Sequence, residues 1–356
     1  MGPKRTTSII ILIVPLIVFF AENDKVTLTS QFLLDQTKEP LGRPGDIEVY
    51  DNGKIFVTDR AFGNIKIYNQ DGSLVRIFGR KGAGPDEFVS PNYIEIDDRK
   101  ICVQDMGQLK YIIFDENFNE ITRFFFLMGA EPFVIDSNRI INYEHLKGKN
   151  GKEFEGAIID FSGKTAKIIK ELLPYKYPKD DYWNRITSMN GFIDISKEKE
   201  HIYFVKENKV EIFKFSREGN FLIKFGENPR YFKTCQKTDD FDTYLKWGRS
   251  PKGIEAGRKW RKSFSWVSGL FVLENYLGID IIIFNNDQRK WEHYLRFYDF
   301  EGNLLEDGIK IKEVGTPSAD ERFLIDSNHK DCIYILEINE DVDPPQHTFF
   351  KYKISI

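Results

Sequence analysis

The chain has 356 residues, of which 41% are hydrophobic and 15% aromatic, so it can bury a large core. Phe (31) and Tyr (16) far outnumber Met (4), a bias that favours β-strands over helical bundles. The formal net charge of −4 excludes a generally basic nucleic-acid-binding protein. Charged residues make up 30% of the chain and give no reason to expect disorder.

The N-terminus has the pattern of a targeting segment. Lys4 and Arg5 precede an uncharged, mostly apolar run over residues 8–21, which is short for a membrane span and of the right length for a signal peptide. Ala21 is an acceptable residue before a cleavage site, whereas Phe19 is too bulky for the usual small-residue rule. We therefore expect residues 1–21 to be a signal peptide or an uncleaved membrane anchor, with a buried helix as the alternative. The protein is then periplasmic, cell-envelope or secreted.

An internal repeat begins after this segment. Residues 42–79 contain four short apolar runs separated by Asp51-Asn52-Gly53, Ala61-Phe62-Gly63 and Gln70-Asp71-Gly72. Asn-Gly and Asp-Gly between alternating segments indicate tight hairpins, because glycine readily takes the positive φ that such turns require. The pattern therefore predicts that this unit is a four-stranded antiparallel sheet.

The same pattern recurs along the chain and predicts an all-β, six-bladed β-propeller of four-stranded antiparallel blades. A single propeller domain then spans residues 22–356. The sixth unit supplies only three strands, and the isolated run at residues 26–35 can provide the fourth. Pairing these ends closes the ring and removes its open edge. The expected blades are 42–79, 93–126, 133–170, 192–226, 266–311 and 321–355, the last completed by 26–35.

One segment, residues 229–265, interrupts the repeats between the fourth and fifth units. It holds ten Lys and Arg residues against four acidic ones, with aromatic residues interleaved. The stretch from Asp239 to Lys246 can form a short helix. The segment is either a solvated loop or a lid that offers cations and stacking surfaces to a ligand.

The junction after the first unit resembles the interblade segment of the NHL-repeat family. Gly82, Gly84, Pro85, Phe88 and Pro91 occupy the positions of that segment, and residues 55–59 and the Asp71-Gly72 turn extend the resemblance over residues 42–126. It implies a diverged six-bladed propeller of the kind found in exported bacterial proteins. Asp59 and Asp105 share a repeat position at which an NHL-like Asp bonds nearby loop backbone.

Few patterns point to catalysis. The three cysteines form no disulfide framework, no Gly-x-Ser-x-Gly occurs, and the five histidines are scattered among different repeat positions. The glycine-rich run at residues 79–85 lacks the Gly-Lys-Ser/Thr ending of a phosphate-binding loop, so an interblade turn is favoured.

We therefore predict a non-enzymatic, monomeric binding module without a cofactor. Its partner is a protein, peptide or glycan rather than nucleic acid, and it contacts a membrane only through an uncleaved N-terminal segment. The candidate ligand-binding residues on the loop face are Arg60, Asn64, Arg80, Lys81, Asn92, Asp105, Gln108, Glu144, His145, Arg230, Trp247, Arg249 and Trp260.

Two alternatives stay open. A metal-dependent hydrolase or lyase would hold one divalent cation in the central channel, since carboxylate and amide oxygens suit such ions. Its candidate ligands are Asp59, Asp105, Glu144, Glu207, Asn285 and Glu337. A structural component of the envelope would need neither a pocket nor a charged face.

Overall fold

The structure is a computed structural model. It describes residues 25–356 apart from 51, 98, 126–131, 137, 148–152, 163–165, 175–190, 197, 312–321, 328–329 and 340–344. The predicted signal peptide or anchor at residues 1–21 lies outside the described residues. So do the side chains of Glu144 and His145, whose backbone belongs to a strand.

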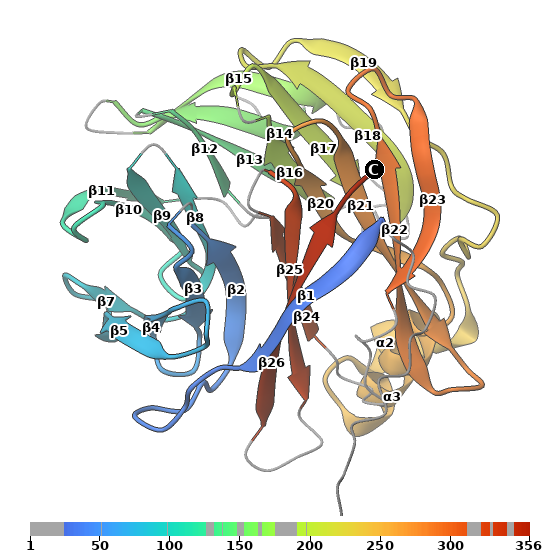
Figure 1. Ribbon diagram of the computed structural model, residues 1–356, viewed down its shortest axis with the longest axis horizontal. Helices are drawn as coiled ribbons and strands as arrows, with labels where there is room; N and C mark the ends of the chain where they lie inside the picture. The colour runs from blue at the N-terminus through green and yellow to red at the C-terminus, as the bar shows by residue number, and fades with distance from the viewer. Residues whose placement is uncertain are drawn as a thin grey trace, which may run out of the picture.

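Six four-stranded antiparallel sheets form a ring, which confirms the predicted six-bladed propeller (Figure 1). Blade 1 contains β2 (Pro44–Val49), β3 (Ile55–Asp59), β4 (Asn64–Tyr68) and β5 (Leu74–Phe78). Blade 2 contains β8 (Pro91–Asp97), β9 (Lys100–Asp105), β10 (Lys110–Asp115) and β11 (Glu120–Phe125). Blade 3 contains β12 (Pro132–Asp136), β13 (Arg139–Lys147), β14 (Glu153–Asp160) and β15 (Lys167–Pro174). Blade 4 contains β16 (Gly191–Ile195), β17 (His201–Lys206), β18 (Lys209–Ser216) and β19 (Phe221–Phe225).

Blade 5 contains β20 (Trp266–Val272), β21 (Leu277–Asn285), β22 (Lys290–Tyr298) and β23 (Leu304–Ile311). Blade 6 joins both ends of the chain: β24 (Arg322–Ser327), β25 (Cys332–Asn339), β26 (Gln346–Ile354) and β1 (Val26–Leu33). β1 runs antiparallel to β26 from Val26, opposite Ile354, to Leu33, opposite Thr348, and Figure 1 shows the two strands side by side. The predicted closure of the ring by the N-terminal strand is therefore confirmed.

The core lies between the blades, and the alternation of side chains along each strand explains why. In β3, Ile55 and Val57 pack into a cluster shared with blade 6, whereas Phe56 between them packs into a cluster shared with blade 2. Successive strand residues point to opposite faces of a sheet, so each blade buries both faces against its neighbours. Similar shared clusters join blades 2 and 3, 3 and 4, 4 and 5, and 5 and 6.

The junction between blades 1 and 2 carries a small parallel pair, β6 (Arg80–Lys81) and β7 (Glu87–Phe88). Gly63 packs against this segment with φ of +65°, and a Cβ there would lie 2.3 Å from the carbonyl oxygen of Phe88. Glycine is therefore required both for its backbone conformation and for the close approach.

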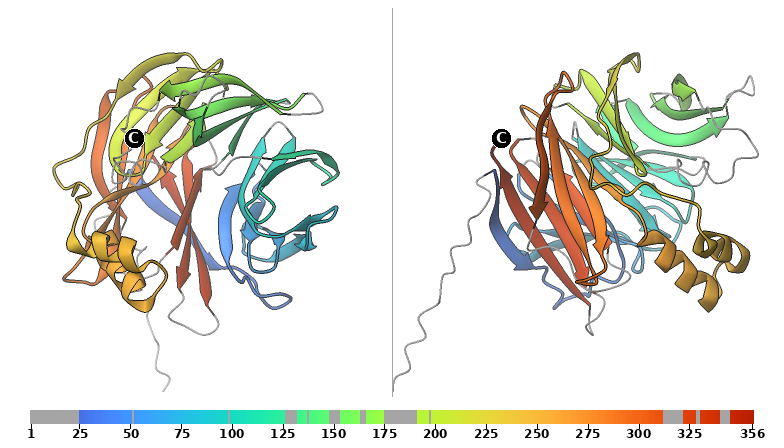
Figure 2. Two further views of the ribbon diagram at one scale, coloured as in Figure 1. Left: turned by 180° about the vertical axis from the view of Figure 1, so that it is seen from behind. Right: turned by 90° about the vertical axis from the view of Figure 1, so that its right-hand side faces the viewer.

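The segment between blades 4 and 5 folds into two helices, α2 (Asp239–Trp247) and α3 (Pro251–Arg261), called here the helical hairpin. Thr238 and Ser250 cap the two N-termini with their hydroxyl oxygens, and Pro251 stands at the first turn of α3. Phe241 and Trp260 pack at 4.8 Å between ring centroids, in a cluster that includes Trp266 of blade 5. Figure 2 shows the hairpin projecting from one side of the ring, beyond the ends of the strands.

Candidate functional site: the central cavity

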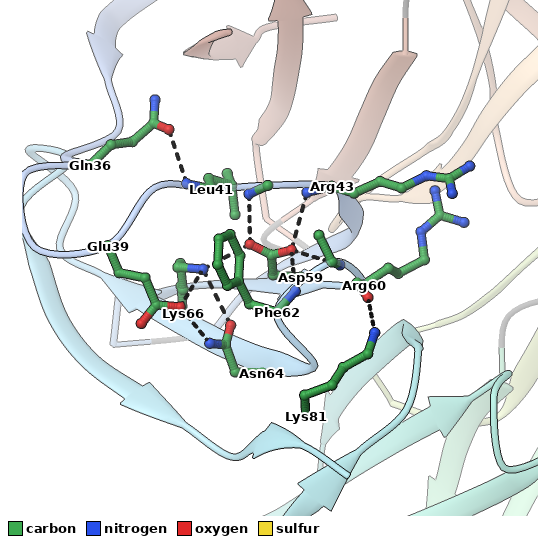
Figure 3. A network of polar contacts seen from close by, with 12 residues as sticks. Gln36, Glu39, Leu41, Arg43, Asp59, Arg60, Phe62, Asn64, Lys66 and Lys81 are labelled. Carbon is green, nitrogen blue, oxygen red and sulfur yellow. Dashed lines mark hydrogen bonds and ion pairs between the residues drawn. The ribbon is translucent and has the colours of Figure 1, made fainter. Parts of the chain in front are cut away.

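The repeated aspartates of blades 1 and 2 bind the loop backbone. Asp59, which is fully buried, accepts hydrogen bonds from the N–H groups of Gly42 (2.7 Å), Arg43 (3.1 Å) and Ala61 (3.0 Å), and from Lys66 Nζ (2.7 Å) (Figure 3). Burial by itself raises the pKa of this carboxyl, but the Lys66 bond and the backbone N–H groups outweigh it and hold the pKa below its ordinary value. The carboxylate therefore ties the interblade segment to the end of β3.

Asp105 occupies the equivalent position one blade later. It accepts hydrogen bonds from the N–H groups of Val89 (2.8 Å), Ser90 (2.8 Å) and Gly107 (2.9 Å), and from Nε2 of Gln108 (2.9 Å). Asp105 is also fully buried. Both aspartates thus have the structural role that the repeat position indicates, and neither presents its carboxylate on the surface.

Other predicted contact residues near blade 1 also have partners within the protein. Asn64 is only 4% exposed, and its amide donates to Glu39 Oε1 (2.8 Å) and accepts from Lys66 Nζ (3.3 Å). Lys81 donates to the carbonyl of Arg60 (2.9 Å), and Arg80 Nε donates to Glu87 Oε1 (2.9 Å). Asn64 is therefore interior, while Arg80 and Lys81 are exposed beside the junction between blades 1 and 2.

The residues predicted as oxygen ligands of a divalent cation make separate contacts in different blades. Besides the two aspartates, Asn285 donates to Glu292 and accepts the N–H of Asp287 (3.0 Å), and Glu337 lies in β25 opposite Thr348. Glu207 lies 3.8 Å from the guanidinium of Arg261. Among the residues that the structure describes, no group of three or more His, Cys, Asp or Glu side chains has an arrangement that could hold a metal ion.

A cavity of about 1110 Å³ occupies the centre of the ring and extends to the helical hairpin. Its wall combines the inner strands β2, β8, β16, β20 and β24 with residues of both helices. This volume lies just above the usual range, about 300–1,000 Å³, of pockets that bind small organic ligands. Of the predicted contact residues, Arg60, Asn92 and Trp260 line the cavity, as does Glu207 from the metal set.

The remaining described candidates lie elsewhere. Arg80, Lys81, Gln108, Arg230, Trp247 and Arg249 do not line the cavity, nor do the buried Asn64 and Asp105. Trp247 stands near the turn of the helical hairpin with 46% of its surface exposed, and Lys252 Nζ lies 5.0 Å from its ring centroid.

Several cationic side chains line one end of the cavity. Five cations line it where the inner strands begin and the hairpin ends, and we call them the rim: Arg43, Arg60, Arg258, Arg261 and Lys262. Arg60 Nη1 donates to Asn92 Oδ1 (3.0 Å), which links blade 1 to blade 2. The Arg261 guanidinium lies over the Trp266 ring at 4.7 Å from its centroid. Tyr244 and Trp291 add further aromatic surface to the wall.

The strands below the rim carry carboxylates. An acidic residue recurs at the same register of four inner strands: Glu48 opposite Phe56, Glu95 opposite Cys102, Asp194 opposite Tyr203 and Asp326 opposite Tyr334. All four line the cavity, together with Asp46.

Three of these carboxylates bridge neighbouring blades. Asp326 Oδ2 accepts the N–H of Val49 (2.5 Å), and Asp194 Oδ2 accepts the N–H of Val272 (2.5 Å). Asp46 Oδ2 accepts the N–H of Ile94 (3.0 Å). The inner edge of a blade otherwise leaves backbone donors without a strand partner, so these bonds satisfy the channel wall and connect the blades.

The pKa of Asp46, one of these carboxyls, is shifted upwards. It is 6% exposed, and burial raises the pKa of its carboxyl, with a further rise from the negative charge of Asp326. The deep part of the cavity therefore favours a protonated Asp46.

Most of the residues that line the cavity were not predicted from the sequence, although the acidic ones follow a repeated pattern. The acidic residue within an apolar inner strand repeats as Ile-Glu-Val at 47–49, Ile-Glu-Ile at 94–96 and Ile-Asp-Ile at 193–195. A recurrent acid amid buried strand residues indicates a common polar environment, because isolated burial of a charge is costly. Arg43 and Arg258 have no comparable signal, since the fold alone brings them to one cavity.

Comparison with known proteins supports the architecture. Residues 28–189 match the family model DUF5128, described as a 6-bladed beta-propeller. No curated protein matches the chain significantly. Among the residues that the structure describes, no helix is long and apolar enough to cross a membrane.

Solved structures share the fold at low sequence identity. One is a Bacteroides fragilis protein to which export is ascribed, with 14% identity, a TM-score of 0.60 and coverage of 93% of this chain and 96% of that one. Another is a DUF4221 family member from Bacteroides vulgatus, with 12% identity, a TM-score of 0.59 and coverage of 94% and 100%. The chain is thus similar to six-bladed propellers in sequence over residues 28–189 and in fold over nearly its whole length.

Proposed function

We propose that this protein is an exported, non-enzymatic binding module whose central cavity, beside the helical hairpin, holds part of a protein, peptide or glycan partner. The observation that carries the proposal is the cavity of about 1110 Å³, walled by five inner strands and by both helices. Concave pockets in which polar groups converge beside apolar surface are the usual place for ligands.

Further features of the chain support the proposal. The cavity wall offers cations and aromatic rings at the rim and carboxylates below it, a mixture that can orient a ligand. The apolar run at residues 8–21 supports export, and the NHL-like resemblance over residues 42–126 supports use of the loop face. Blade-to-blade packing makes the wall rigid, so binding needs little reorganisation.

A pair of variants on α2 tests the site. Tyr244 lines the cavity and Trp247 does not, although both side chains are similarly exposed, at 38% and 46%. Calorimetric titration of the purified chain with a panel of glycans and peptides should yield a ligand whose binding weakens about tenfold on Tyr244→Ala, the loss expected for one aromatic contact of roughly 1.4 kcal/mol.

Trp247→Ala is the matched control and should bind within about twofold of the native chain, since it removes no group from the cavity wall. A ligand lost through Trp247→Ala but retained by Tyr244→Ala would place binding on the outer surface of the hairpin and contradict the cavity proposal.

A further inference from the structure

We propose that the outer end of the helical hairpin docks on the surface of an anionic lipid bilayer. This end, called here the hairpin tip, consists of residues 245–252, where α2 ends and α3 begins. The inference goes beyond the proposed function, because none of the tip residues, all of which the structure describes, lines the cavity. It adds a membrane contact to the one expected from the apolar run at residues 8–21.

The hairpin tip exposes apolar and cationic side chains, and its sequence contains no acidic residue. Leu245 and Trp247 have 37% and 46% of their surface exposed. The cations Lys246, Arg249 and Lys252 are exposed beside them. Exposed Trp and Leu side chains beyond those that function needs are few on protein surfaces, so this pair indicates a contact. The accompanying charges indicate that the partner is anionic.

The cations of the tip gather around one aromatic ring. Nζ of Lys252 lies 5.0 Å from the Trp247 ring centroid, and Nζ of Lys246 lies 5.8 Å from it. The acidic residues that flank the tip in the sequence pair with other lysines of the insertion, Asp242 at 3.4 Å and Glu255 at 2.9 Å. Positive charge and apolar surface are therefore concentrated together at the tip.

The tip lies at the end of the hairpin that is not attached to the ring. Phe241 and Trp260 anchor the opposite end through their cluster with Trp266 of blade 5. The hairpin projects beyond the ends of the strands (Figure 2). A Cβ added at Gly248, in the turn between the helices, would meet no described atom within 4 Å. An extended surface can therefore reach the tip.

A bilayer fits these features better than a protein partner does. Tryptophan is enriched at the interface between membrane and water, and Lys and Arg near that interface are attracted to anionic head groups. A specific protein interface buries about 800 Å² on each partner, which is more than two apolar side chains at a helix turn can supply. A bilayer admits Leu245 and Trp247 at the level of its head groups without a complementary pocket.

Vesicle co-sedimentation tests the inference on the chain from residue 22, which contains the strands of all six blades. Vesicles of phosphatidylcholine with about 30% phosphatidylglycerol would be compared with vesicles of phosphatidylcholine alone. We expect at least tenfold tighter binding to the anionic vesicles, since each cation at the surface contributes about fivefold. Raising the salt concentration from about 50 to 300 mM should weaken this binding severalfold, because salt screens the charges. Brominated acyl chains should quench part of the tryptophan fluorescence.

Two matched pairs of variants locate the contact. Lys252→Gln should weaken binding to the anionic vesicles about fivefold, whereas Lys259→Gln, further along α3, removes the same charge and should weaken it less than twofold. Trp247→Ala should weaken binding about tenfold and remove the quenching by brominated chains. Phe221→Ala removes a similarly exposed ring, 55% exposed on β19, and should do neither. Matching melting temperatures would show that all four variants fold.

Several results would overturn the inference. These are equal binding to the two kinds of vesicle, no binding to either, or equal losses within a matched pair of variants. Binding of soluble polyglutamate that depends on Trp247, without vesicle binding, would also overturn it, because the tip would then be a site for acidic proteins. The proposed function is tested separately, since ligand binding in the cavity should depend on Tyr244 and not on Trp247. Either proposal can therefore fail while the other stands.

Discussion

Replacing Asp59 with alanine should destabilise the propeller more than the same change at Asp105. Both carboxylates are fully buried and each accepts three backbone N–H bonds of 3.1 Å or less. Only Asp59 also pairs with a buried cation, since Lys66 has no exposed side-chain surface and lies 2.7 Å away. At Asp105 the neutral amide of Gln108 takes that place.

The magnitudes follow from these partners. Loss of Asp105 leaves buried N–H donors without an acceptor and should cost about 3 kcal/mol. Breaking a buried ion pair by removing one partner costs about 3–5 kcal/mol. Lys66 retains a second partner, Glu39 at 3.3 Å, which reduces this amount. We therefore expect Asp59→Ala to be about 2 kcal/mol worse than Asp105→Ala.

Urea unfolding followed by tryptophan fluorescence measures both variants under the same conditions. A third protein, Asp59→Ala combined with Lys66→Met, removes the orphaned charge and should recover about 2 kcal/mol of the loss. Equal destabilisation by the two single variants would refute this reasoning, and so would a double variant no more stable than Asp59→Ala.

Three further predictions concern pH and ring closure. Burial lowers the pKa of His347 to about 4, against about 6.5 when unfolded, so the neutral ring stabilises the fold and this stability is lost as pH falls from 6.5 towards 4. Relative to His347→Asn, the native chain should lose about 3 kcal/mol between pH 7 and pH 4 in urea unfolding, and a constant difference would contradict this. Because the pKa of Asp46 is raised by burial and by Asp326, the folded state retains a proton that the unfolded state releases, and native stability falls as pH rises towards the folded pKa. The melting temperature of Asp46→Asn minus that of the native chain should therefore be larger at pH 9 than at pH 5. An equal difference at the two pH values would show that the pKa of Asp46 is not raised in the folded state. Deleting residues 25–34 exposes the edge of β26, so we expect a lower melting temperature and self-association in sedimentation, whereas a monomer of native stability would disprove the role of β1.

The parts of the site predictable from sequence are those whose partners lie close in the chain. Asp59 bonds residues within 17 positions, and Asp105 bonds residues within 16, so the repeat motif already contains both the carboxylate and its donors. The first helix of the insertion was likewise predicted from its local pattern. The second helix was not, although Ser250 and Pro251 are a recognisable N-terminus, because two glycines within α3 weaken its helical pattern.

The amino-acid sequence determines the repeat, the number of blades and the strand that closes the ring, since each follows from hydrophobic alternation and turn residues within short segments. Only the tertiary structure determines which residues line the cavity. Arg43 and Arg258 lie more than 200 positions apart in the sequence. They line the same cavity because the closed ring fixes the positions of blade 1 and of the helical hairpin. Similarly, the direction of Glu48 or Asp194 towards the channel depends on strand register and on burial of the alternate residues between blades. Period-two patterns give two faces to every strand, and packing of the neighbouring blades assigns each face its environment.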